Sequence, residues 1–418
     1  VMPEKWWELF DDQTLDHLED LARQNNQDLV IAMANVDKAR ALARVERAGL
    51  WPQADLGPSL GRSRSSGNAS TFSQPSRITN SYKIPVDLSY EVDIWGRVRR
   101  TFAAGRAEAQ AEAAAYGTVF LTLTADVAQN YFAIGAVDAQ IEALVGAVDL
   151  RQKAVDMLKL RLEHGINSEL TYYQAQTQLS QAQADWVDAR RRRENLVNAL
   201  AVLCGQRASD FTLPAVPLKT VVPQIPAGIP SHVLQNRPDI LEAERLIAAA
   251  SERLGIAKAA YFPSITLTGS AGYASIDAGN LLDWESRVWS VGPSVSMPIF
   301  SGGRLKAEEL AQQVTYEKTL AEYKKRILVS FGEVENALAD IRMRREQYGA
   351  QEELLRSATQ AAEISIQRYK EGLVTFLEVI DAERSRLEAQ RGAIQIQSET
   401  LISTVHLIKA LGGNWPKI

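Results

Sequence analysis

The sequence predicts a mixed, mainly helical fold that is internally duplicated, with a pair of β-strands ahead of each of two very long helices. Three observations lead to this expectation. Motifs of the first half recur in the same order in the second half. Two long stretches lack proline and consist mostly of helix-forming residues. Segments in which apolar and polar residues alternate precede both stretches.

The duplication is visible in matched positions. Asp28 corresponds to Asp239, and Trp51-Pro52 to Phe262-Pro263, in both cases 211 positions later. Residues 161–165 recur 207 positions later. Small differences in loop length account for the change of offset. Each half is therefore expected to hold a helix, two strands, a very long helix, a turn and a returning helix.

Residues 97–164 and 304–371 are predicted to form the two very long helices. Neither stretch contains proline, and Ala, Glu, Gln, Leu and Arg dominate both. In the first, apolar residues are spaced three or four apart, with one step of seven, as in a coiled coil. They are Phe120, Leu123, Val127, Tyr131, Ile134, Val137, Ile141, Leu144, Val148, Val155, Leu158 and Leu162. Each helix would be ~100 Å long at 1.5 Å per residue.

Short segments with a period of two are predicted to be strands. The pattern is clear in residues 84–92, 265–273 and 291–299 and weaker in residues 54–60. The strands are expected to be joined by loops at 61–81 and 276–287, and the aromatics near their ends to lie at a membrane interface. These aromatics are Trp51, Trp95, Tyr261, Phe262 and Trp289. A soluble sheet with one wet face explains the same alternation.

Composition excludes several classes of protein. The net charge of −5 leaves no basic excess for nucleic acid, and the run Arg190–Arg193 is expected to be a solvated or ion-pairing helix face. The single cysteine, Cys204, lies among apolar residues and is expected to be packed. No run of about 18 apolar residues occurs, so no membrane-spanning helix is expected. Four scattered histidines without a catalytic motif indicate neither an enzyme nor a metal or cofactor site.

Four strands cannot close a membrane barrel, because spanning barrels begin at about eight strands. Open sheet edges are not tolerated in lipid. If these strands meet a membrane, several chains must therefore contribute to one barrel, and three chains would supply twelve strands.

The sequence resembles the outer membrane factor family of tripartite pumps, the TolC-like channels, and most closely its OprM/NodT-like branch. The resemblance covers essentially the whole chain. It is carried by Asn236-Arg237-Pro238-Asp239-Ile240, Ala260-Tyr261-Phe262-Pro263-Ser264-Ile265, Pro298–Gly303, Leu377–Arg384 and Lys409–Trp415.

The resemblance implies a homotrimer with a twelve-stranded outer-membrane β-barrel, a long periplasmic α-helical barrel and an equatorial region. Its implied partners are outer-membrane lipid, a periplasmic adaptor and an inner-membrane transporter of the RND or MFS type. It implies passive conduction of drugs, detergents or bile-salt-like compounds, without catalytic residues or cofactors. Members of the branch that this sequence resembles usually begin with a lipidated cysteine. This sequence starts at Val1 without one, so a lipid anchor stays open, and either a signal peptide has been removed or none existed.

The pattern and the resemblance together divide the chain into consecutive parts. The first repeat consists of N-terminal equatorial and periplasmic helices at 1–50, a first barrel hairpin at 51–96, and a first long helix with returning helices at 97–213. A proline-rich connector follows at 214–231. The second repeat consists of a helix at 232–260, a second barrel hairpin at 261–301, and a second long helix, returning helices and C-terminal equatorial segment at 302–418.

The resemblance also implies a gate at the periplasmic end. Asp381 and Arg384 are its main candidates, with Glu378 and Leu377 nearby and Tyr369 as a weaker latch candidate. Asp381 and Arg384 are three residues apart and so share a helix face. An ordinary exposed ion pair is the alternative reading.

The two hairpin tips are implied to face the adaptor, although each is also explained as a simple tight turn. They consist of Gly165, Ile166, Asn167 and Ser168, and of Gly372, Leu373, Val374 and Thr375. A soluble coiled-coil scaffold remains the alternative function. It accounts for the long helices but not for the duplicated strand pairs.

Overall fold

The computed structural model describes residues 5–66, 77–218, 223 and 237–416. Two compact units are distinguished. The first comprises residues 1–33, 114–241 and 325–418, and the second comprises residues 34–113 and 242–324.

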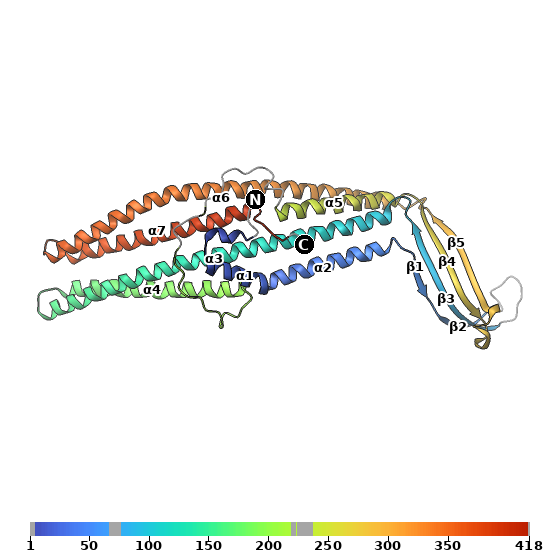
Figure 1. Cartoon of the computed structure of the whole chain (residues 1–418), viewed down its shortest axis with the longest axis horizontal. Coiled ribbons are helices and arrows are strands. Elements are labelled where there is room, and N and C mark those ends of the chain that lie inside the picture. The colour runs from blue at the N-terminus through green and yellow to red at the C-terminus, as the bar shows by residue number, and fades with distance from the viewer. Residues whose placement is uncertain (1–4, 67–76, 219–222, 224–236, 417–418) are drawn as a thin grey trace. The chain divides into compact units, whose positions relative to one another are not determined.

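Helices dominate the described residues, and all the described strands belong to the second unit (Figure 1). The helices are η1 (Trp6–Phe10), α1 (Gln13–Asn25), α2 (Gln27–Ala48), α3 (Arg97–Glu163), α4 (Glu169–Leu203), α5 (Pro238–Ala259), η3 (Ala278–Asn280), η4 (Trp284–Ser286), α6 (Arg304–Lys370) and α7 (Phe376–Ala410). The strands are β1 (Gln53–Leu56), β2 (Ser59–Arg64), β3 (Ile78–Val92), β4 (Ser264–Ser275) and β5 (Arg287–Ser296).

Equal helix lengths confirm the predicted duplication. Helices α3 and α6 both have 67 residues, α4 and α7 both have 35, and α2 and α5 both have 22. The predicted apolar spacing also holds, because Phe120, Val127, Ile134 and Leu158 are all buried.

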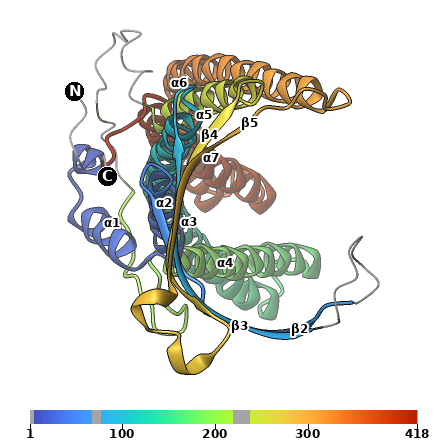
Figure 2. The ribbon, with the colours of Figure 1, turned by 90° about the vertical axis from the view of Figure 1, so that its right-hand side faces the viewer.

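The strands form one antiparallel sheet (Figures 1 and 2). Strands β1 and β2 pair with successive stretches of β3, β3 pairs with β4, and β4 pairs with β5. The contact between β3 and β4 joins the two repeats. Among the described residues, strand β5 forms one edge of the sheet, and strands β1 and β2 together form the other.

The register collects most of the apolar side chains of the strands on one face, because directly paired residues point to the same side. Val92, Ile265 and Val295, for example, lie in one row. The same face carries Ala54, Leu56, Leu60, Tyr82, Ile84, Val86, Leu88, Tyr90, Leu267, Ala271, Tyr273, Trp289 and Val291. The opposite face carries Asp55, Ser59, Lys83, Asp87, Ser89, Glu91, Thr266, Thr268, Ser270, Ser290 and Ser294. Val288 also lies on this opposite face, and Arg62, Arg64 and Arg287 at the far end of the strands lie on the apolar one.

Several predicted boundaries were wrong by a few residues. Residues 61–64 and 78–81, predicted as loop, belong to β2 and β3, because their backbones pair across the hairpin despite polar and glycine side chains. Strand β5 ends at Ser296, two residues before Pro298, which has no N–H to donate to a ladder. The connector and the start of the next helix fall partly on 219–222 and 224–236, outside the described residues. Helix α5 begins at Pro238.

The exclusion of any helix long and apolar enough to span a membrane was also too strict. Helix α3 contains an 18-residue window with a mean hydropathy of 1.4, of which 44% is buried. By length and composition alone this window could cross a membrane. Small and polar residues interrupt its apolar runs, so a search for consecutive apolar residues misses it.

The core of the first unit is built around an N-terminal aromatic cluster. Trp6, Trp7 and Phe10 of η1 are buried, and the Phe10 ring lies 4.9 Å from that of Phe132 in α3. Cys204 is buried among these elements as predicted, and burial raises the pKa of its thiol to about 12. This packing anchors the base of the hairpins that carry the candidate gate.

Three of the four arginines at 190–193 form ion pairs, in agreement with one of the two predicted alternatives, and the Arg190 guanidinium lies 5.0 Å from the Trp186 ring. Arg191 and Arg192 contact Asp188, while Arg193 contacts Asp138 and donates hydrogen bonds to the carbonyl oxygens of residues 213 and 214. Arg193 thereby ties the start of the connector to the first hairpin.

Candidate functional site

The first unit presents two helical hairpins, α3–α4 and α6–α7, that end in equivalent turns (Figure 1). Gly165 and Gly372 have positive φ values of 71° and 76°. The N–H groups of Gly165 and Ile166 donate to carbonyls three and five residues earlier, at 2.9 and 2.8 Å. Gly372 and Leu373 repeat both bonds at 3.0 and 2.9 Å. Both turns are therefore Schellman motifs, in which glycine avoids the strain of the left-handed conformation.

Side-chain caps start the two returning helices. The hydroxyl of Ser168 accepts a hydrogen bond from the Thr171 N–H at 3.4 Å. Thr375 and Glu378 form a capping box, in which Glu378 accepts from the Thr375 N–H at 3.5 Å. Glu378, a candidate gate residue, thus fixes the start of α7.

The tips expose large apolar side chains at repeat-related positions. Ile166 and Leu373 are 70% and 63% exposed, and Leu170 and Leu377 are 67% and 50% exposed. The neighbouring Asn167 and Val374 are half-buried, and the capping residues Ser168 and Thr375 are exposed. Exposed apolar groups at such tips are typical of a surface that contacts another protein.

Asp381 and Arg384 lie together on α7, as their spacing predicts. The Arg384 Nη2 atom is 3.9 Å from Asp381 Oδ1, and Arg384 Nε is 3.9 Å from Glu388 Oε1. The side chains of Asp381 and Arg384 are 60% and 58% exposed. Within one chain this is a solvated pair worth under about 1 kcal/mol.

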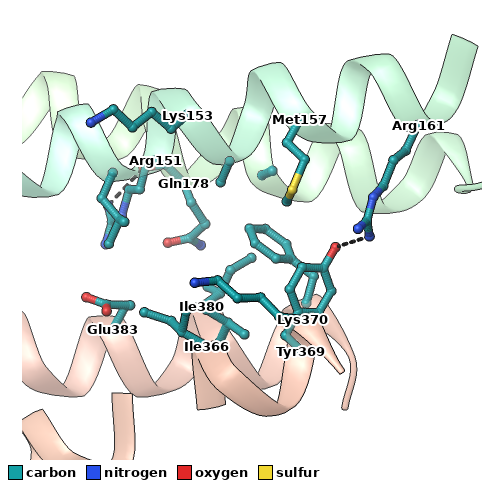
Figure 3. A pocket seen from close by; sticks show the side chains of 15 residues that line it. Arg151, Lys153, Met157, Arg161, Gln178, Ile366, Tyr369, Lys370, Ile380 and Glu383 are labelled. Atoms are coloured by element: carbon teal, nitrogen blue, oxygen red, sulfur yellow. Dashed lines mark hydrogen bonds between the residues drawn. The ribbon is translucent and has the colours of Figure 1, made fainter. Parts of the chain in front are cut away.

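Tyr369 makes a contact that sequence reasoning did not find. Its hydroxyl accepts a hydrogen bond from Nη1 of Arg161 at 3.1 Å, and the Arg161 guanidinium lies 5.6 Å from the Tyr369 ring (Figure 3). Tyr369 belongs to α6 and Arg161 to α3, so this bond connects the two hairpins of one chain. Because Arg161 and Tyr369 are 208 positions apart, no local sequence pattern indicates that they are in contact.

Four of the five predicted aromatic residues lie near the end of the sheet at which β1 and β4 begin and β3 ends. They are Trp51, Trp95, Tyr261 and Phe262. The rings of Trp95 and Phe262 stack 4.6 Å apart, and the Trp95 indole donates to the carbonyl of Pro263 at 2.8 Å. Trp51 is 66% exposed, and the Tyr261 hydroxyl donates to Glu309 at 2.9 Å.

Trp289 lies toward the opposite end of the strands. It is the third residue of β5, projects from the apolar face and is 78% exposed. The predicted aromatic residues therefore lie near both ends of the strands.

Among the described residues, no group of three or more His, Cys, Asp or Glu side chains is arranged to hold a metal ion. The features that stand out are a two-faced sheet and a pair of equivalent hairpin ends.

Comparison with known proteins gives one consistent match. The family described as outer membrane efflux protein matches residues 18–206 and 229–413, one match in each repeat. Two relatives from Pseudomonas putida are similar over 98% of this chain. The solvent efflux pump outer membrane protein SrpC is 36% identical over 87% of its own length, and the antibiotic efflux pump outer membrane protein ArpC is 33% identical over 85%.

A solved structure agrees with the sequence relatives. The CmeC outer membrane channel of Campylobacter jejuni superimposes with a TM-score of 0.94 and 27% identity, covering 100% of this chain and 89% of that one. The chain therefore belongs to the outer membrane efflux protein family of TolC-like channels, and it is an outer-membrane efflux channel and not an enzyme.

Proposed function

We propose that this chain is one of three identical subunits of the exit duct of a tripartite efflux pump. The duct conducts compounds passively across the outer membrane after an inner-membrane transporter and a periplasmic adaptor have delivered them. The observation that carries this proposal is the sheet, which has one apolar face, one polar face and two edges as described.

The sheet requires neighbours if it lies in lipid. Its apolar face suits contact with hydrocarbon and its polar face suits an aqueous lumen. The backbone groups along β5 and along β1–β2 would each cost several kcal/mol if they were left unpaired in lipid. Because β1 and β2 occupy one position beside β3, each chain supplies four strand positions. Three chains, joined edge to edge, would close a twelve-stranded barrel and pair these backbone groups.

The mass of the purified particle tests this assembly. We expect a particle that contains three chains and that depends on detergent, measured by light scattering with correction for bound detergent. A monomer or dimer that is stable in plain buffer would overturn the pooled barrel and favour a soluble coiled-coil scaffold.

The tips of the hairpins are proposed to contact the adaptor. Ile166 and Leu170 on one tip and Leu373 and Leu377 on the other present exposed apolar side chains. The tight Schellman turns leave room for a second helical hairpin to approach closely. The repeat gives each subunit two such tips, so three subunits would offer six docking places of two kinds.

The transported compounds are proposed to be organic molecules with substantial apolar surface, such as drugs, detergents, bile-salt-like compounds and solvents. The names of the relatives SrpC and ArpC refer to solvents and antibiotics. The duct supplies neither energy nor chemistry, so selectivity rests mainly with the transporter.

Asp381 and Arg384 are proposed to close the duct at its periplasmic end, where threefold symmetry would bring three copies of the pair to one axis. Three contacts of these side chains between subunits, made only in the closed state and worth about 0.5 to 1 kcal/mol each, would favour closure by roughly 1.5 to 3 kcal/mol. Asp381→Ala should therefore raise the open probability of single channels in planar bilayers by roughly ten- to a hundredfold.

The matched control is Asp188→Ala, which removes another exposed aspartate paired with an arginine three residues later, on α4. We expect it to leave the resting conductance unchanged. An unaltered conductance in Asp381→Ala would rule out a gating role for this pair.

A further inference from the structure

A cavity of about 320 Å³ lies between the two hairpins of the first unit, close to their turns (Figure 3). Helices α3 and α4 form one wall, and α6 and α7 form the other. Its apolar lining includes Met157, Ile366, Phe376, Val379 and Ile380. This volume lies at the lower end of the range for small-molecule sites in proteins.

The charged groups that line this cavity are mostly cationic. Arg161 lies toward the turns, and Arg151 lies farther from them, opposite the carboxylate of Glu383 (Figure 3). The ammonium group of Lys370 lies between these two ends of the cavity. Glu383 already forms an ion pair with Arg386 at 2.7 Å. The lining therefore has an excess of positive charge beside apolar walls.

Lys370 is the cation best placed to meet a ligand. Its side chain extends into the space between the hairpins (Figure 3), and within the described part of the chain no hydrogen bond or ion pair of its ammonium group is found. Arg161 lies nearer the turns, on the other side of Tyr369 from the Lys370 ammonium, and donates to the Tyr369 hydroxyl (Figure 3). An ammonium group beside apolar walls is complementary to an anionic head on a hydrocarbon body.

We propose that this cavity binds an amphipathic organic anion, such as a medium-chain carboxylate. Its head group contacts the ammonium of Lys370, and its hydrocarbon chain lies between Met157 of α3 and Phe376 and Ile380 of α7. Because the ligand contacts both hairpins, it binds best at their present spacing and opposes their separation. The site is distinct from the exposed tips and from Asp381 and Arg384.

Photolabelling of the full-length protein in lipid nanodiscs tests the site, with a decanoate that carries a diazirine near the end of its chain. Mass spectrometry of peptides then locates the label. We expect saturable labelling within residues 150–161 and 366–383 that excess unlabelled decanoate suppresses and decanol suppresses at least fivefold less well. Loss of one exposed charge interaction, in Lys370→Met, should weaken decanoate binding by about fivefold.

Two further variants separate the cavity from general partition into the bilayer. Lys159→Met makes the same substitution on the exposed surface of α3, outside the cavity, and should leave labelling unchanged. Ala154→Phe fills part of the cavity and should abolish saturable labelling at these peptides while the melting temperature is retained. Equal labelling of the wild-type, Lys370→Met and Ala154→Phe proteins would overturn the proposal, as would equal competition by decanol and decanoate. Labelling does not depend on conductance, so its outcome is separate from that of the gate.

Discussion

Arg237→Ala should destabilise the first unit by about 3 to 5 kcal/mol, because it leaves a buried carboxylate without its main partner. The Arg237 side chain is 8% exposed and donates to both oxygens of Asp239, at 3.0 and 2.8 Å. The same guanidinium contacts Glu333 of α6 at 2.7 Å and the carbonyl of Ala410, the last residue of α7, at 2.9 Å. One side chain thereby connects three segments that are distant in sequence.

Chemical unfolding of the detergent-solubilised protein, followed by intrinsic tryptophan fluorescence, measures this change. The control is Arg356→Ala, which removes an exposed arginine that pairs with Glu353 on α6, and it should cost under about 1 kcal/mol. Arg237→Lys keeps the charge but cannot donate to two carboxylate oxygens in the same way, so an intermediate loss is expected. A loss below 1 kcal/mol in Arg237→Ala would show that Asp239 is adequately paired without it.

Glu19→Gln should remove a strong pH dependence from the stability of the first unit. The Glu19 side chain is fully buried, and neither carboxylate oxygen has a hydrogen-bond partner among the described residues. Burial raises the pKa of Glu19 well above its ordinary value of 4.5, and the nearby Arg23 offsets only part of this effect. The folded chain therefore keeps a proton that the unfolded chain releases above pH 4.5.

The direction of the pH effect follows from this difference. Below pH 4.5 the Glu19 carboxyl group is protonated in both the folded and the unfolded state, so it gives the free energy of unfolding no pH dependence. Between 4.5 and the raised pKa of the folded state, the free energy of unfolding falls by about 1.4 kcal/mol for each pH unit. From pH 5.5 to 7.5 the wild-type protein should thus lose up to about 2.7 kcal/mol more than Glu19→Gln, which is neutral throughout.

Unfolding curves at a series of pH values test this expectation. Glu388→Gln changes an exposed glutamate on α7 and should retain the wild-type slope. Parallel stability profiles for the wild-type protein and Glu19→Gln would mean that Glu19 is hydrated or paired in solution.

Much of the fold could be predicted because it is encoded in local periods. The spacing of Phe120, Leu123 and Val127 identifies a helix, and the alternation in residues 84–92 identifies a strand. Because the chain is duplicated, each of these patterns occurs in both halves and each half supports the prediction for the other. Boundaries such as that of β2 were missed because Gly61 and Ser63 carry no strand preference and are held in the ladder by β3.

The candidate site was predictable only where its partners are close in sequence. Asp381 and Arg384 lie three residues apart on one helix, so helical geometry alone brings them together. The contact between Arg161 and Tyr369 depends on how two hairpins align, which no local pattern specifies. The apolar cavity has the same origin, since residues from all four helices contribute to it.

The edges of the sheet have a consequence for how the channel reaches the membrane. A solitary chain that entered lipid would carry the unpaired amides of β5 with it, and this raises the barrier to insertion. If three chains form the barrel as proposed, encounter between chains becomes part of the rate-limiting step, so the rate of insertion should rise more steeply than in direct proportion to chain concentration. In that assembly, a defective copy that pairs at only one edge would trap the intact copies that join it. Dominant inhibition by such copies is therefore an expected property of the proposed barrel.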